Sequence, residues 1–155
     1  MKRYHTGLDI LKRFQKRGQA TGTFGCPFFM NLSLTSKRDI FGVEEKENEL
    51  LFKFNIQKEF CNLHGTLHGG AISTLVDITT GMCITSNDEQ RRNSVSLQMS
   101  TTFLNPGYVN TEIYIHTRTD KKGYKIATST CEFYNSDMDL LAKGDHVKVF
   151  VKEQV

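Results

Sequence analysis

A nearly uncharged stretch dominates the pattern of hydrophobic and polar positions in this chain. Between Glu59 and Asp88, only Asp77 carries a formal charge. Apolar residues recur there at helical spacing, which predicts a buried helix that starts near Gly69 and runs for about 17 residues, or about 25 Å. The residues of this stripe are Ile72, Leu75, Val76, Thr79, Met82 and Cys83.

Asp77 lies on the other face of the predicted helix. At 100° per residue it shares that face with small or polar side chains, namely Ser73, Thr80 and Gly81, and with Ile84. Such a face is not typical of a solvated surface, so we expect a further element or a second chain to pack against it. A lone aspartate in an apolar helix is also compatible with a buried group that a neighbouring hydroxyl satisfies.

Alternating apolar positions predict six strands around this helix. The clearest alternation precedes it, where Leu50, Phe52 and Phe54 are each separated by one residue. The six predicted strands cover residues 30–38, 49–56, 95–103, 109–118, 124–134 and 140–151.

The first strand after the helix has a regular pattern. Val95, Leu97 and Met99 are predicted to face one way, and Ser96 and Gln98 to face the other. Regular alternation would therefore keep Ser96 off the apolar face of this strand.

These elements predict an α+β fold in which an antiparallel sheet of six strands wraps around one long helix. Such a sheet has to bury one face, and the buried helix is the obvious filling. Residues 1–25 are expected to form an N-terminal helix and its connection, because Leu8, Leu11 and Phe14 recur at three-residue spacing. This basic segment also has a weak likeness to a mitochondrial targeting peptide, which stays open as an alternative. No repeat or linker divides the chain, so a single domain is predicted for residues 1–155.

Composition excludes several classes of function. The net charge of +3 is small and no basic stripe alternates with aromatic residues, so no nucleic-acid partner is expected. No run of about 18 apolar residues occurs, so no membrane span is expected. The cysteines lie far apart without a CxxC pair, which favours reduced thiols and an intracellular, cytoplasmic location. They are Cys26, Cys61, Cys83 and Cys131.

The start of the predicted helix suggests carbonyl chemistry. Gly69 and Gly70 leave unpaired backbone N–H groups there with no side chains in the way. A helix start carries partial positive charge and suits an oxygen that becomes negative during a reaction. A carboxylate further along, that of Asp77, is a candidate base or nucleophile. A metal site at His64 and His68 would require a helix at these residues, and the intervening glycine argues against one.

The segment that leads into the predicted helix, together with Asp77, resembles a motif of the hotdog-fold thioesterases. The residues that carry the resemblance are the segment 62–70, Asn-Leu-His-Gly-Thr-Leu-His-Gly-Gly, followed by Leu75-Val76-Asp77. The resemblance is strongest to the phenylacetate-degradation type and its animal relative, thioesterase superfamily member 2 (acyl-CoA thioesterase 13). It implies a hotdog fold, a homotetramer built as a dimer of dimers, and hydrolysis of acyl-CoA thioesters in fatty acid metabolism without a metal or other cofactor.

The resemblance also implies roles for individual residues. The N–H of Gly69 and the side chain of Asn62 would polarise the thioester carbonyl, and His68 would help to orient the thioester. Asp77 would activate the attacking water, which Ser96 would hold with it. The first three residues would come from one subunit and the last two from its partner.

Substrate contacts beyond the thioester are harder to place. Gly70 is a further candidate, and the phosphates of CoA require cations. The candidate cations are Arg91, Arg92, Lys121, Lys122 and Lys143. Two other functions stay open: a hotdog protein that binds acyl thioesters without hydrolysing them, and a hotdog hydratase or dehydratase.

Overall fold

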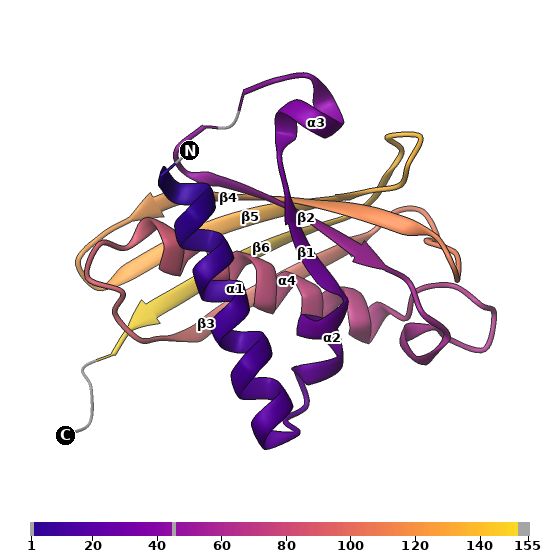
Figure 1. The fold of residues 1–155 in the computed structure, drawn as a ribbon, viewed down its shortest axis with the longest axis horizontal. Helices are drawn as coiled ribbons and strands as arrows, with labels where there is room; N and C mark the ends of the chain where they lie inside the picture. Colours follow the sequence, from indigo (N-terminus) through magenta and orange to yellow (C-terminus); the bar gives the residue numbers. More distant parts are fainter. Residues whose placement is uncertain (1, 45, 152–155) are drawn as a thin grey trace.

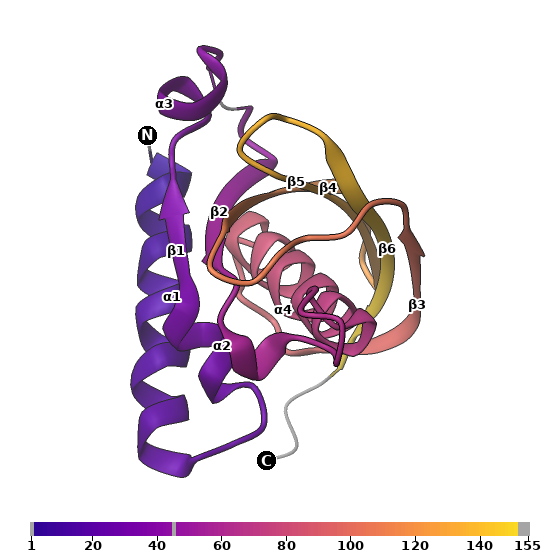
Figure 2. The same cartoon turned by 90° about the vertical axis from the view of Figure 1, so that its right-hand side faces the viewer.

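A curved antiparallel sheet surrounds one long helix, as the sequence predicts. The computed structural model describes residues 2–44 and 46–151. Helix α4 (Gly69–Asn87) lies in the concave side of a six-stranded sheet with the strand order β1-β2-β4-β5-β6-β3 (Figures 1 and 2). The strands are β1 (Leu32–Thr35), β2 (Glu49–Asn55), β3 (Ser94–Phe103), β4 (Glu112–Lys122), β5 (Ile126–Tyr134) and β6 (Leu140–Phe150).

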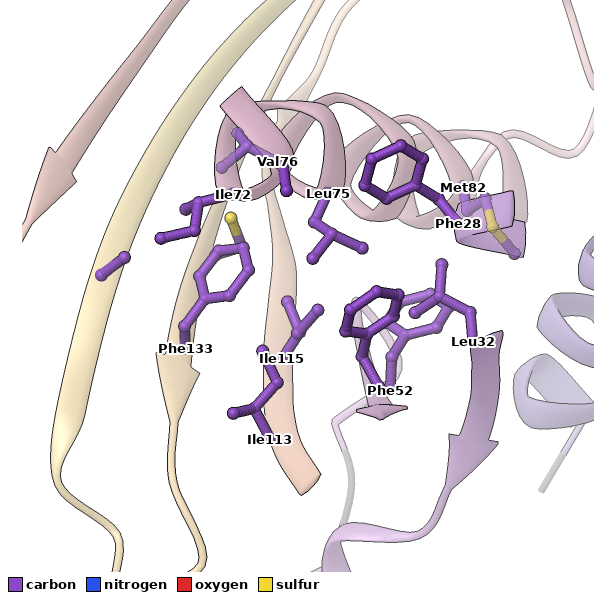
Figure 3. Close-up of a cluster of buried hydrophobic side chains, with 14 of the residues drawn as sticks. Phe28, Leu32, Phe52, Ile72, Leu75, Val76, Met82, Ile113, Ile115 and Phe133 are labelled. Carbon is purple, nitrogen blue, oxygen red and sulfur yellow. The ribbon is translucent and has the colours of Figure 1, made fainter. Parts of the chain in front are cut away.

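The predicted apolar stripe of α4 forms the centre of the core. Leu75 and Val76 are fully buried against side chains of the sheet, including Ile115 and Phe133 (Figure 3). A Cβ on Gly144 of β6 would lie 2.6 Å from both methyl carbons of Val76. Glycine at this position therefore allows the close approach of α4 to the sheet.

The N-terminal segment packs against the domain as a helix. In α1 (Lys2–Thr21), Ile10 and Leu11 are buried, and the ring of Phe14 stacks on Phe29 at a centroid distance of 5.1 Å. No helix among residues 2–44 and 46–151 is long and apolar enough to cross a membrane.

Three short helices were not predicted from the sequence. Helix α2 (Cys26–Asn31) and the 3₁₀ helix η1 (Lys58–Phe60) are too short to show a helical period. The strand predicted for residues 30–38 is too long, because α2 includes its first two residues and α3 (Lys37–Phe41) its last two. The ends of α3 nevertheless carry recognisable signals. The Ser36 side chain accepts a hydrogen bond from the N–H of Arg38, and Gly42 adopts a left-handed conformation at the C-terminus.

The regular alternation predicted for β3 is wrong. Ser96 pairs with Lys148 of β6, but Gln98 pairs with Val147, so Leu97 is an extra residue that forms a β-bulge. The bulge shifts the pleat by one residue. Ser96 therefore lies on the helix-facing side of the sheet together with Met99, which pairs with the buried His146.

Candidate functional site

The start of α4 leaves backbone donors without a partner among the described residues, and the N–H of Gly69 is one of them. The exposed side chain of His68 caps the helix, and its Nδ1 accepts the N–H of Gly70 at 2.8 Å. The N–H of Gly69 makes no hydrogen bond within residues 2–44 and 46–151. Of the two glycine amides considered in the sequence, Gly69 is the one available to a ligand, and Gly70 is engaged by the cap.

Asn62 belongs to a hydrogen-bonded loop that leads into α4. Its Oδ1 accepts the N–H of His64 at 2.9 Å and of Thr66 at 3.2 Å, and its Nδ2 donates to the Thr66 hydroxyl at 2.8 Å. An amide has two N–H donors, so one hydrogen of Nδ2 stays available. Within the described part of the chain, no three His, Cys, Asp or Glu side chains gather where they could hold a metal ion.

Asp77 lies in a polar cluster between α4 and the inner face of the sheet. Half of its side chain (51%) is exposed, and its Oδ1 is 3.3 Å from the Ser96 hydroxyl. The pairing expected between Asp77 and Ser96 is thus present within one chain. Two further residues, both on β6, complete the cluster. Lys148 Nζ lies 3.6 Å and His146 Nε2 3.7 Å from the same carboxylate oxygen.

His146 is the residue that sequence reasoning missed most clearly. Its side chain is wholly buried, with Nδ1 2.7 Å from the Thr80 hydroxyl and Nε2 2.9 Å from the Ser96 hydroxyl. Burial and then the nearby Lys148 ammonium lower the pKa of His146 to about 4, against an opposing effect of Asp77. The imidazole is therefore neutral at pH 7. One signal was available in the sequence. His146 and Lys148 are polar residues at alternate positions of β6, on the face of the strand that points toward the helix.

The second face of α4 is covered to a greater extent than the sequence suggested. Thr80 and Ile84 are fully buried within the same chain, and Ser73 reaches the Thr101 hydroxyl of β3 at 3.4 Å. Asp77 is the main exception, because its carboxylate remains half open. The sheet of the same chain therefore covers most of this face of α4.

The two halves of the candidate site are well separated within one chain. Gly69 and Asp77 are eight residues apart on the same helix, which corresponds to about 12 Å along its axis. A thioester carbonyl bonded to the Gly69 N–H therefore lies out of reach of the Asp77 carboxylate of the same chain.

A cleft of about 400 Å³ opens beside Asp77. Its apolar wall includes Phe14 and Phe29, and it also contains Arg13 and Arg17 of α1. Asp77 is the only acidic residue among those that line the cleft. The two α1 arginines were not singled out in the sequence, because nothing there placed α1 beside Asp77.

The five candidate cations for CoA differ in their surroundings. Arg91 lines the cleft and is exposed. Arg92 also lines it, but its guanidinium is bonded to the buried Asp88 at 2.8 Å and lies 3.7 Å from the Phe150 ring centroid.

The three lysines lie elsewhere. Lys122 donates to the Asn87 carbonyl at 2.6 Å, and Lys143 pairs with Glu132 at 3.4 Å on an exposed part of β6. Lys121 is exposed near the end of β4 and does not line the cleft. Among the five, Arg91 is the best placed for a ligand beside Asp77.

Known proteins share both the motif-bearing segment and the fold. The model of the thioesterase superfamily matches residues 64–142. A Caenorhabditis elegans protein named provisionally as an esterase is 30% identical over 117 residues, which cover 75% of this chain and 69% of that protein. Mouse acyl-coenzyme A thioesterase 13 is 30% identical over 107 residues, or 68% of this chain and 76% of the mouse protein. The crystal structure of zebra fish thioesterase superfamily member 2 has a TM-score of 0.79 and 24% identity, over 93% of this chain and 98% of that one.

Proposed function

The chain belongs to the thioesterase superfamily, and from that premise we propose that it hydrolyses acyl-CoA thioesters to the free acid and CoA. The resemblance seen in the sequence, the hotdog architecture and the assignment as a thioester hydrolase are confirmed at the level of the family. The observation that carries the finer proposal is the half-exposed Asp77 carboxylate beside the Ser96 hydroxyl, in a chain whose Gly69 N–H is unpartnered within its described residues.

In this proposal Asp77 acts as the general base. It takes a proton from water while the water oxygen bonds to the thioester carbon and the carbonyl electron pair moves to the oxygen. The tetrahedral intermediate then collapses, the C–S bond breaks, and the CoA thiolate leaves and takes the proton from Asp77. A positioned base typically contributes about 10²–10⁴ in rate.

The oxyanion would be stabilised by the second half of the site. The Gly69 N–H and the remaining hydrogen of Asn62 Nδ2 would donate to it, and His68 Nε2, which the helix cap leaves free, would orient the thioester. One donor of this kind is worth about 2.7–4 kcal/mol of the activation barrier. The role of Gly70 is then to fix the His68 ring and not to bind the carbonyl.

We further propose that the site is shared between two copies of the chain, in a homodimer that can pair into a tetramer. The distance between Gly69 and Asp77 along α4 supports this proposal. The edge strand β3 supports it independently, because Val95, Leu97 and Phe103 are each at least half exposed. An uncovered edge strand that carries apolar side chains is typical of an interface.

The arginine-lined cleft suits the anionic part of the substrate. Arg91, with Arg13 and Arg17, would meet the phosphates of CoA, since arginine binds phosphate through paired hydrogen bonds. These contacts are exposed, so they should weaken with added salt.

Release of free thiol from a panel of acyl-CoAs tests the proposed function. The wild-type protein should release thiol, and Asp77→Asn should lower the turnover at least 100-fold, at the lower end of about 10²–10⁴ for a general base. Thiol release by a folded Asp77→Asn protein at the wild-type rate would refute the role of Asp77. Binding of acyl-CoA without thiol release would favour the non-hydrolytic alternative, and loss of enoyl absorbance without thiol release would favour a hydratase.

A further inference from the structure

The hydrogen bonds around the buried Thr80 determine the tautomer of His146. The Thr80 hydroxyl lies 2.6 Å from the Val76 carbonyl oxygen and 2.7 Å from His146 Nδ1. A hydroxyl has a single proton, and a carbonyl oxygen has none to give. Thr80 must therefore donate to Val76, and His146 Nδ1 must carry the hydrogen that it donates to Thr80.

With Nδ1 protonated in the neutral ring, His146 Nε2 is a bare acceptor. The Ser96 hydroxyl is 2.9 Å from Nε2 and 3.3 Å from Asp77 Oδ1. If Ser96 gave its proton to Asp77, the wholly buried Nε2 would be left without a partner, which is costly. Ser96 therefore donates to His146.

Because the Ser96 proton points to His146 Nε2, the Ser96 oxygen presents only its lone pairs toward Asp77 and Lys148. Lys148 Nζ, 3.2 Å from the Ser96 oxygen, donates to one of them. We propose that His146 is a positioning residue that fixes the Ser96 hydroxyl as an acceptor toward the Asp77 carboxylate, so that the attacking water gives one proton to Asp77 and one hydrogen bond to Ser96. Both hydrogens of the water are then engaged, and its free lone pair points toward the thioester carbon.

The charge state of the ring agrees with this arrangement. Burial and Lys148 hold the pKa of His146 near 4, so the ring is neutral at pH 7. A protonated ring would donate to Ser96 and turn the Ser96 proton toward Asp77, where the water has to bind.

A double-mutant cycle tests the inference, which rests on the proposed thioester hydrolysis. His146→Leu removes the acceptor and should lower kcat about tenfold with KM unchanged, the effect of one directed hydrogen bond. His146→Gln keeps an acceptor at a similar reach and should retain most of the activity. In a Ser96→Ala background, both changes should have no further effect on kcat. A loss from His146→Leu that persists in the Ser96→Ala background would overturn the inference.

His116 provides a matched control. It is a partly buried histidine of the same sheet, on β4. Its pKa is lowered mainly by burial, and it does not line the cleft beside Asp77. His116→Leu should leave kcat unchanged. A loss equal to that of His146→Leu would show that removing a histidine from this sheet is harmful in itself, and would overturn the inference.

A second pair of variants serves where His146→Leu fails to fold. Thr80→Val has nearly the same shape but removes the acceptor for Nδ1, whereas Thr80→Ser keeps it. Thr80→Val should lower kcat several-fold, Thr80→Ser should not, and neither should matter in the Ser96→Ala background. Equal effects of the two substitutions would contradict the inference.

The ring tautomer can be measured without any substrate. Nitrogen-15 NMR of the histidine-labelled protein, with the His146 signals identified by their loss in His146→Gln, should show protonation at Nδ1 at pH 7. Protonation at Nε2 would overturn the inference even if thioesters are hydrolysed. A wild-type protein that shows the Nδ1 tautomer but releases no thiol would instead refute the proposed function and, with it, the catalytic part of the inference.

Discussion

Proline at position 69 would remove the proposed oxyanion donor and little else. Gly69 is the first residue of α4, a position where proline is favoured because the lost N–H has no partner within the helix. The residue before a proline must be extended, and His68 already is, with φ −64° and ψ 138°. A Cβ at Gly69 would have ordinary contacts, the nearest being with the Phe103 ring at 3.4 Å. The helix position, the extended His68 backbone and the room for a Cβ are therefore all compatible with Gly69→Pro.

The expected cost of Gly69→Pro follows from the loss of one donor to the oxyanion. Such a donor is worth about 2.7–4 kcal/mol, so kcat should fall about 10²–10³-fold. Gly69→Ala is the matched control, because it adds a Cβ but keeps the N–H, and its effect should be much smaller. The assay is thiol release from acyl-CoA, with circular dichroism and size-exclusion chromatography to show that fold and assembly are unchanged.

Two results would refute this reasoning. Wild-type turnover by Gly69→Pro would show that the N–H does not contact the oxyanion. Equal losses in the alanine and proline variants would show that crowding against Phe103, and not the missing donor, limits the reaction.

Three further predictions follow from the same structure. When Asp77→Asn and Gly69→Pro chains are unfolded and refolded together in equal amounts, activity should recover to about a quarter of wild type, since half of the dimers are mixed and each has one intact site; no recovery would refute a shared site. Asp88→Asn should lower the melting temperature at pH 7. The Arg92 guanidinium bonded to Asp88 lowers the pKa of that carboxyl in the folded protein. The ionised Asp88 carboxylate therefore stabilises the fold above the unfolded pKa of about 3.9, and this stabilisation is lost as the pH falls through the lower folded pKa. A difference in melting temperature between the two proteins that persists at pH 2 would contradict this. Arg91→Gln should raise KM for acyl-CoA at low salt and reduce its salt dependence, with kcat unchanged; an unaltered KM would exclude Arg91 from binding the phosphates.

The main elements of this fold could be predicted because their signals are local. The apolar residues of α4 recur at the helical period and those of β2 alternate, so the period alone reveals both elements, although each is also buried on its other face. Helices of five or six residues, such as α2 and α3, are shorter than two turns and give no period.

The candidate site could be predicted only in part. Gly69 was visible because it begins an apolar helix, and Asp77 because it is the one charged residue within that helix. His146 and Lys148 were not, because they lie far along the chain and meet Asp77 only when α4 packs against β6 in the folded sheet. Interpretation of Ser96 required the bulge, which is a property of strand pairing and leaves no periodic signal.

The extra residue in β3 makes the orientation of Ser96 depend on the pairing of the strand and not on the spacing of the sequence. Because Leu97 is half exposed and unpaired in the ladder, many side chains are compatible with its position. Because Ser96 pairs with Lys148 and Gln98 with Val147, loss of Leu97 would make the pleat even and leave Ser96 on the helix-facing side. A slip of the strand that paired Ser96 with Val149 would instead turn its hydroxyl to the convex side of the sheet, away from Asp77. Among homologous chains, a one-residue gap at this position is therefore compatible with an intact water-holding pair.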